Sequence, residues 1–206
     1  MSKHTNNGFT LVEMMIAIGI AAIIAVMAVP SMNSSFDKKR VTKSAETLYA
    51  NLQLARSESI ARFRQVHVRF NTTGSTWQYG VSQNALCDLT QTDPTVGNGN
   101  GCLLVVDDGD GTVDDGTATV DAQDTVLYRF TQAETQGVNM TLDTIPANNQ
   151  ITFDPTRGTA LGAATITLQS EQGFKMRLIV GVLGQVRLCS PAGAGHVGGY
   201  SSDACV

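Results

Sequence analysis

The sequence predicts an α+β protein in which one long helix precedes a head built from short strands. Residues 31–64 contain neither proline nor glycine, are rich in helix formers, and directly follow an apolar run. From residue 65 onward, short alternating or apolar segments stand between turn residues, which is typical of strands. We therefore expect one helix over residues 10–63 and a β-rich head over residues 65–206.

The second half of the expected helix is amphipathic. Apolar side chains recur there at steps of three and four residues, which places them on one helical face; they are Val41, Ala45, Leu48, Leu52 and Ala55. We expect this face to lie on the sheet of the head. Residues 32–70 carry an excess of bases and residues 71–206 an excess of acids. The net charge of −4 argues against a general nucleic-acid binder.

The head is expected to contain nine short strands. They cover residues 65–70, 77–81, 102–106, 125–130, 137–142, 151–154, 164–168, 174–180 and 182–188.

The apolar run over residues 9–29 is long enough to cross a bilayer and carries one charge, that of Glu13. A cleavable secretory signal would have a more basic start and a shorter apolar core. An ionisable group within a membrane costs about 2.5–3.5 kcal/mol and marks a functional residue by default. Since the segment offers Glu13 no partner, we expect the partner to come from another molecule or from a new chain end.

The stretch "GFTLVEMMIAI" resembles the class III signal of type IV pilins and type II secretion pseudopilins. The resemblance implies that a prepilin peptidase cuts between Gly8 and Phe9 and methylates the new Phe9 amine. It also implies that Glu13 pairs with the N-terminal amine of a neighbouring subunit during filament assembly. The proline in the middle of the family's stem matches Pro30, where we expect a helix kink.

The resemblance divides the chain into four parts. These are a leader peptide (1–8), a transmembrane helix segment (9–31), the periplasmic amphipathic half of the same helix (32–64) and the globular head (65–206). It places the protein in the inner membrane as a single-pass chain, with a cytoplasmic N-terminus and a periplasmic head, before assembly into the pilus. The bases at residues 38–43 would favour the opposite orientation by the positive-inside rule. The pilin signal and the cysteines favour the periplasmic head.

Three stretches of the rest of the chain narrow the resemblance. "NLQLARSESIARFRQVHVRF", "ITFDPTRGTA" and "VGVLGQVRLC" resemble the GspH/FimT/FimU family of minor pilins and pseudopilins. The implied function is that of a FimT/FimU-type minor pilin that helps to prime pilus assembly at the filament tip, a structural role without enzymatic activity or cofactor. The implied partners are other minor pilins, the major pilin, the prepilin peptidase and the inner-membrane assembly platform. Two alternatives stay open: the type II secretion pseudopilin GspH in protein export, and a DNA-binding minor pilin in natural transformation.

The four cysteines fall into two close pairs, Cys87 with Cys102 and Cys189 with Cys205. Their spacing is unlike that of metal sites. Local bridges would each close a loop of about fifteen residues and add roughly 3 kcal/mol of stability. Spacing does not exclude the other two pairings. Disulfides indicate an oxidising compartment.

Two further patterns are candidates for binding sites. The Asp-rich run "VVDDGDGTVDDG" contains Asp108 and Asp110, whose carboxylates are the kind of ligand that Ca²⁺ takes, which makes them weak candidates for a calcium site. The run departs from the EF-hand pattern, so a solvated hairpin is favoured. FimT-type members of the resembled family bind DNA through a C-terminal G-R-x-R motif. This chain has "GQVR", in which Arg187 matches and Gln185 replaces the first arginine. Lys175 and Arg177 would complete a weak basic patch.

Overall fold

The computed structural model describes residues 9–73, 76–91, 101–105, 125–127, 129–132 and 137–205, without the side chains of residues 25–31, 105 and 125–127. The chain divides into two compact units, Met1–Phe36 and Asp37–Val206. The first contains the start of the long helix. The second contains the rest of that helix and the head.

Helix α1 spans Leu11–Arg62, which confirms the helix expected over residues 10–63. At its start, the Glu13 backbone N–H donates to Thr10 Oγ1 at 3.3 Å, so Thr10 caps the first turn. Glu13 itself is the acid of that turn, where the helix dipole favours a negative charge. Pro30 lies within α1 among the residues whose side chains are not described, and the kink expected there stays a prediction.

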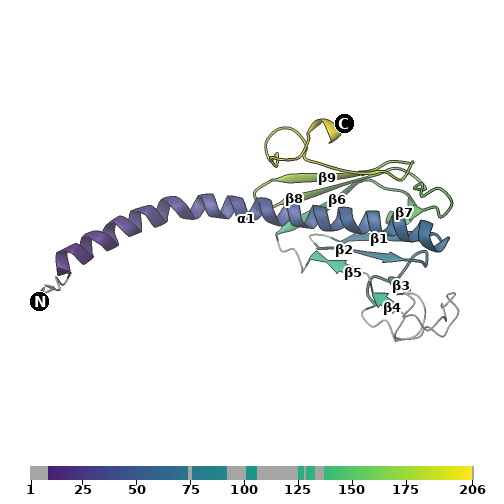
Figure 1. Cartoon of the computed structure of the whole chain (residues 1–206), viewed down its shortest axis with the longest axis horizontal. Coiled ribbons are helices and arrows are strands. Elements are labelled where there is room, and N and C mark those ends of the chain that lie inside the picture. The colour runs from purple at the N-terminus through teal and green to yellow at the C-terminus, as the bar shows by residue number, and fades with distance from the viewer. Residues whose placement is uncertain are drawn as a thin grey trace, which may run out of the picture. The chain divides into compact units, whose positions relative to one another are not determined.

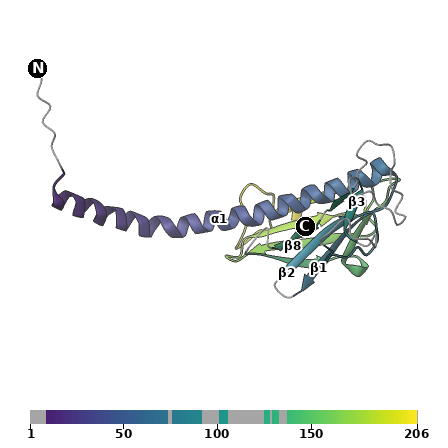
Figure 2. The same ribbon diagram turned by 90° about the horizontal axis from the view of Figure 1, so that it is seen from below.

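The strands of the head form two four-stranded antiparallel sheets and a separate pair, shown in Figures 1 and 2. The first sheet has the order β5-β2-β1-β7, the second has the order β10-β9-β8-β6, and β3 pairs with β4. The bounds are β1 Val66–Thr73, β2 Thr76–Ser82, β3 Leu103–Val105, β4 Thr125–Leu127, β5 Arg129–Thr131, β6 Val138–Thr144, β7 Gln150–Phe153, β8 Ala164–Ser170, β9 Lys175–Val180 and β10 Val186–Cys189, with short 3₁₀ turns at Ala147–Asn149 and Asp203–Cys205.

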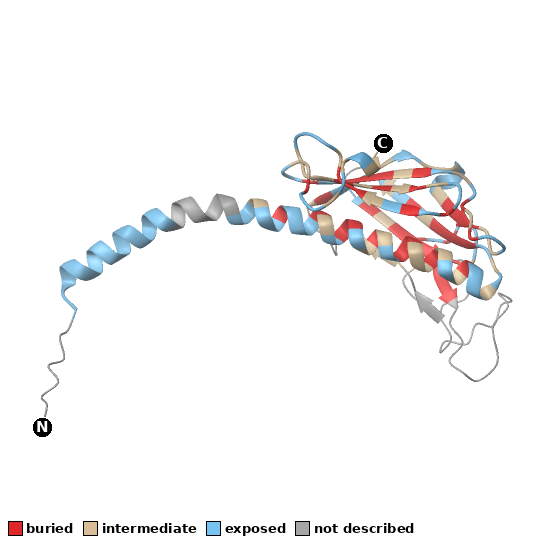
Figure 3. Cartoon of the chain, turned by 45° about the horizontal axis from the view of Figure 1, so that its top comes forward, coloured by how far each residue is buried: buried red, intermediate tan, exposed pale blue. Residues whose placement is uncertain are grey.

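The apolar face of α1 packs on these sheets as expected. All five predicted face residues are fully buried: Val41, Ala45, Leu48, Leu52 and Ala55. They form one hydrophobic cluster with the inward side chains of both sheets, including Phe70 and Tyr79 of β1 and β2 and Leu168 and Leu178 of β8 and β9. Figure 3 shows these buried positions recurring along the second half of the helix. The burial of this stripe explains why the amphipathic half is helical.

Two of the expected strands differ in the structure. The segment 125–130, expected as one strand, contains two: β4 pairs with β3, whereas β5 pairs with β2. Consecutive residues therefore serve different sheets, which a periodicity over six residues does not reveal. The strand expected at 182–188 begins only at Val186, because residues 181–185 form the turn between β9 and β10. There the Gly181 N–H donates to Gln185 O at 2.9 Å.

A row of three cross-strand neighbours holds the loop of the Cys87–Cys102 disulfide on the outer face of the first sheet. Arg69, Gly80 and Arg129 lie side by side on β1, β2 and β5. Arg69 Nη1 donates to Leu86 O at 2.9 Å and to Cys87 O at 2.7 Å. From the other side, Arg129 Nη1 donates to Leu89 O at 2.9 Å. Gly80 sits between the two arginines, under Cys102.

Gly80→Ala is expected to destabilise the head, because a Cβ at position 80 would lie 2.5 Å from Cys102 Cβ and 2.6 Å from its Sγ. The disulfide cannot give way as a flexible side chain would, so we expect an overpacking loss of about 1–3 kcal/mol in the free energy of unfolding. Thermal unfolding of the purified chain measures it. The control is Gly198→Ala, where an added Cβ meets nothing within 4 Å. Equal unfolding temperatures for the two variants would show that the loop does not pack on Gly80.

Candidate functional site

The N-terminal unit presents apolar side chains to the outside over its whole circumference. Between residues 9 and 24, the large apolar side chains are exposed by 55% at Ile20 to 78% at Phe9. They are Phe9, Leu11, Val12, Met14, Met15, Ile16, Ile18, Ile20, Ile23 and Ile24. Figure 3 shows this part of the helix as exposed. A helix that is apolar all round is stable only when another apolar surface covers it.

Glu13 is the one charged side chain in residues 9–36. Its carboxylate is exposed and, within the part of the chain that the structure describes, has no hydrogen bond or ion pair. Phe9 lies four residues before it and begins the described chain, while Gly8 lies outside the described residues. The described residues therefore provide an apolar helix with one acid near its start that pairs with no other described residue.

Among the residues that the structure describes, no helix combines the length and the apolar character that a membrane span requires.

Polar contacts fasten the second half of α1 to the head. Asn51 Nδ2 donates to Tyr79 Oη at 2.8 Å within the buried interface. Near the start of this unit, the Gln172 N–H donates to Asp37 Oδ2 at 3.0 Å. Because these bonds accompany a continuous apolar interface, residues 37–62 and the sheets form a single packed body.

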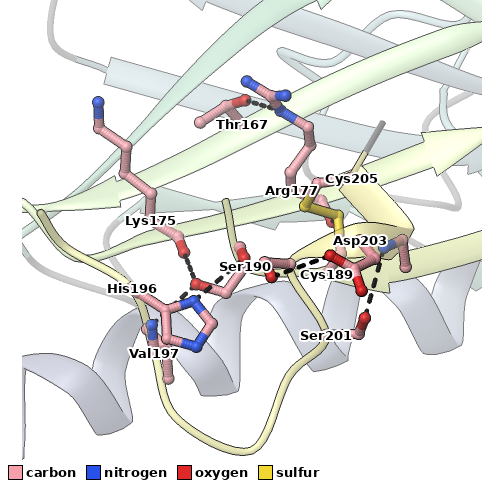
Figure 4. Close-up of a disulfide and its surroundings, with 12 residues drawn as sticks. Thr167, Lys175, Arg177, Cys189, Ser190, His196, Val197, Ser201, Asp203 and Cys205 are labelled. Atoms are coloured by element: carbon pink, nitrogen blue, oxygen red, sulfur yellow. Dashed lines mark hydrogen bonds between the residues drawn. A yellow bond between two sulfur atoms is a disulfide. The ribbon is translucent and has the colours of Figure 1, made fainter. Parts of the chain in front are cut away.

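The disulfide between Cys189 and Cys205 closes the C-terminal loop against the second sheet (Figure 4). Ser190 is central to this loop: its Oγ donates to Lys175 O at 2.8 Å and accepts from the Val197 N–H at 2.8 Å. Together with the Cys87–Cys102 bridge, this gives the two local pairings that the sequence spacing favoured.

A further contact joins the C-terminal loop to the helix. Tyr200 Oη donates to a carboxylate oxygen of Glu46. Burial, with the Glu46 carboxylate as hydrogen-bond partner and negative neighbour, raises the pKa of Tyr200 to about 12. The tyrosine is therefore a neutral donor at physiological pH.

The three basic residues suggested as a DNA patch share the outer face of the second sheet. Lys175 and Arg177 alternate with the buried residues of β9, and Arg187 of β10 pairs with Ile179 in the same outward set. Figure 4 shows the side chains of Lys175 and Arg177 directed to the same side. Arg177 is engaged, however: its Nε lies 3.2 Å from Thr167 Oγ1 and 3.9 Å from Asp143 Oδ2. The three basic residues therefore share one face of the sheet, but the contacts of Arg177 with Thr167 and Asp143 reduce the positive charge that this face offers.

The remaining candidate binding residues have less structural support. Asp108 and Asp110 lie outside the described residues, and within the described ones no group of three or more His, Cys, Asp or Glu side chains could hold a metal ion. His67 is buried, and its Nδ1 lies 2.8 Å from Thr152 Oγ1 and 2.9 Å from Gln150 Nε2. Burial lowers the pKa of His67, so its ring packs in the neutral form.

Sequence analysis did not identify the row of Arg69, Gly80 and Arg129. The alternation in residues 66–70 puts Arg69 on the outer face of its strand, and this position was the one feature of the sequence that could have pointed to it. Nothing in the sequence indicated that a distant disulfide loop would cover this face.

Comparison with known families gives two matches. The profile described as "Prokaryotic N-terminal methylation motif" matches residues 3–29. The profile described as "Type II transport protein GspH" matches residues 44–184, which is more than half of the chain.

Individual proteins extend the comparison. Two proteins of Pseudomonas aeruginosa named "Fimbrial protein" are each 27% identical over 107 residues, which cover 52% of this chain. The match spans 64% of the length of each relative. Among solved structures, the type IV minor pilin FimU of P. aeruginosa has a TM-score of 0.43 at 15% identity, covering 73% of this chain and 88% of that one. The minor pseudopilin EpsH of Vibrio cholerae has a TM-score of 0.46 at 16% identity, covering 75% and 99%. On the extent of the family match, the chain belongs to the family of type II transport protein GspH, the GspH/FimT/FimU group of minor pilins and pseudopilins.

Proposed function

We propose that this protein is a FimT/FimU-type minor pilin that enters a type IV pilus and helps to prime its assembly at the tip. One observation carries the proposal: Glu13 has no partner among the residues that the structure describes, and it lies in an apolar helix whose described side chains are exposed. In a filament, neighbouring apolar helices cover this surface, and the N-terminal amine of a neighbour pairs with the acid. Both needs of the isolated chain are then met by other subunits.

The proposal includes the route by which the chain reaches the filament. A prepilin peptidase removes residues 1–8 and methylates the amine of Phe9. Residues 9–31 hold the chain in the inner membrane, with the head in the periplasm, until the assembly platform adds the chain to a filament. The major pilin and other minor pilins are its partners there. The role is structural, as for the filament subunits of this family, and needs no cofactor.

The type II secretion pseudopilin GspH is the second candidate, and the description of the matching family favours it. The relatives named "Fimbrial protein" favour the pilus, although the match spans only part of their length.

A clean deletion strain separates the two candidates. We expect surface pili to vanish or become rare, with export of type II substrates unchanged, and a plasmid copy of the gene to restore the pili. Normal pili with failed export would replace the pilus role by the pseudopilin role.

DNA binding is the third candidate, and its support is the shared outward face of Lys175, Arg177 and Arg187. If the protein has this role, we expect the DNA affinity of the purified chain to fall as salt is added. We also expect Arg187→Ala to lower the affinity for every DNA sequence by a similar factor. Gln185 lies in the turn before β10, and the ion pair of Arg177 with Asp143 leaves few charges for phosphate.

A further inference from the structure

The apolar side chains exposed on the second unit gather at one end of it. Among the described residues from 37 onward, six large apolar side chains are exposed, and five belong to three neighbouring segments. These five form what we term the distal patch: Ile60, Phe63, Leu161, Val182 and Leu183. The sixth, Leu86, lies beside the first disulfide. Apolar residues scattered singly over a surface need no explanation, whereas a cluster marks an interaction site.

Backbone contacts and one side-chain hydrogen bond bring the three segments of the distal patch together. Arg56 Nε donates to Gly158 O at 3.0 Å, which joins the last turns of α1 to the loop after β7. The Ala160 N–H donates to Val182 O at 3.1 Å, which joins that loop to the turn before β10. A Cβ at Gly184 would lie only 1.8 Å from Gly158 O, so the glycine permits this close approach.

Phe63 has a backbone conformation that its side chain does not favour. It ends the helix with φ 53°, in the left-handed region, and its side chain is 81% exposed. That conformation is unfavourable for a non-glycine residue, and glycine or asparagine is usual at this position of a helix. A strained, exposed aromatic residue is a reason to infer function, and aromatic residues are the commonest anchors of protein interfaces.

The charges around the distal patch suggest its partner. Arg64 and Arg157 flank it, and in the described part of the chain neither guanidinium group has a carboxylate within 4.0 Å. Glu58 is already occupied by Arg62, at 2.6 Å. A surface that combines apolar side chains with acids at its edge is complementary to this arrangement.

We propose that the distal patch docks the head of another filament subunit, through a face that is apolar at its centre and acidic at its edge. This inference rests on the proposed function. Between Asp37, where the N-terminal unit joins, and Arg62, α1 extends over roughly 38 Å at 1.5 Å per residue. Within the second unit, the patch therefore lies at the end of α1 opposite to Asp37 (Figure 1).

The test uses the full chain in cells that assemble filaments. The patch variant combines Phe63→Asn with Leu183→Ser, and the control is the single variant Leu86→Asn. Leu86 matches Phe63 because it is exposed at 51% and has a positive φ of 61°. Incorporation into sheared filaments is measured for each, along with thermal unfolding. A photo-reactive residue at position 183 identifies the contact by mass spectrometry.

We expect the patch variant to enter filaments about tenfold less than the control, the loss typical of an interface hot spot, with an unfolding temperature no lower than that of the wild type. The label at position 183 should cross-link to an apolar, acid-edged face of another pilin-like head. Normal incorporation of the patch variant, in cells where Glu13→Ala fails to assemble, would overturn the docking proposal and leave the proposed function standing. A cross-link to lipid instead of protein would also overturn it. Normal incorporation of Glu13→Ala as well would refute the proposed function itself.

Discussion

Glu13→Ala is expected to leave the protein inserted in the inner membrane and absent from the filament. The carboxylate has no partner in the described part of the chain, and the surrounding helix is apolar. An acid in a membrane costs about 2.5–3.5 kcal/mol, so the alanine variant inserts at least as well as the wild type. It lacks the charge that attracts a neighbour's amine. Immunoblots of membrane and sheared-filament fractions measure both effects.

Two conservative variants identify which property of Glu13 matters. Glu13→Gln keeps the size and removes the charge, whereas Glu13→Asp keeps the charge on a shorter side chain. We expect the glutamine variant to fail like alanine and the aspartate variant to assemble in part. Normal assembly of the glutamine variant would mean that pairing with an amine is not the role of this residue.

Leu52→Ala is expected to cost about 3 kcal/mol in the free energy of unfolding, within the range for removing a buried leucine side chain. Leu52 is fully buried between α1 and the sheets, in the cluster that unites helix and head. Denaturant unfolding of the purified chain measures the loss. Leu183→Ala makes the same chemical change at a side chain that is 66% exposed, and its stability should stay close to that of the wild type. Equal stabilities for the two variants would contradict the packing described for the helix.

The parts of the fold that the sequence predicted depend on short-range patterns. Steps of three and four residues identified the buried face from Val41 to Ala55, and the absence of proline and glycine after residue 30 gave the helix its length. The strands followed from alternation between turn residues. Both disulfides join cysteines that are close in the sequence, so their spacing was informative.

The parts that the sequence did not predict depend on contacts between distant residues. The break between β4 and β5 arises because neighbouring residues pair with different sheets. A side chain at position 80 would collide with Cys102, and one at position 184 would collide with the carbonyl oxygen of Gly158. Both neighbours are distant in the sequence. The distal patch was also missed, because its side chains come from segments that are about a hundred residues apart along the chain. Glu13 was noticed from the sequence because it is the one charged residue in a long apolar run, and its role in assembly stays a prediction.

The most direct test of the central claim is mass spectrometry of the protein's N-terminal peptide in filaments sheared from the cell surface. If the chain is a processed filament subunit, the filament fraction contains a peptide that begins at an N-methylated Phe9. If the protein occurs only in the membrane fraction, with residues 1–8 still attached, the chain is neither processed nor assembled as proposed.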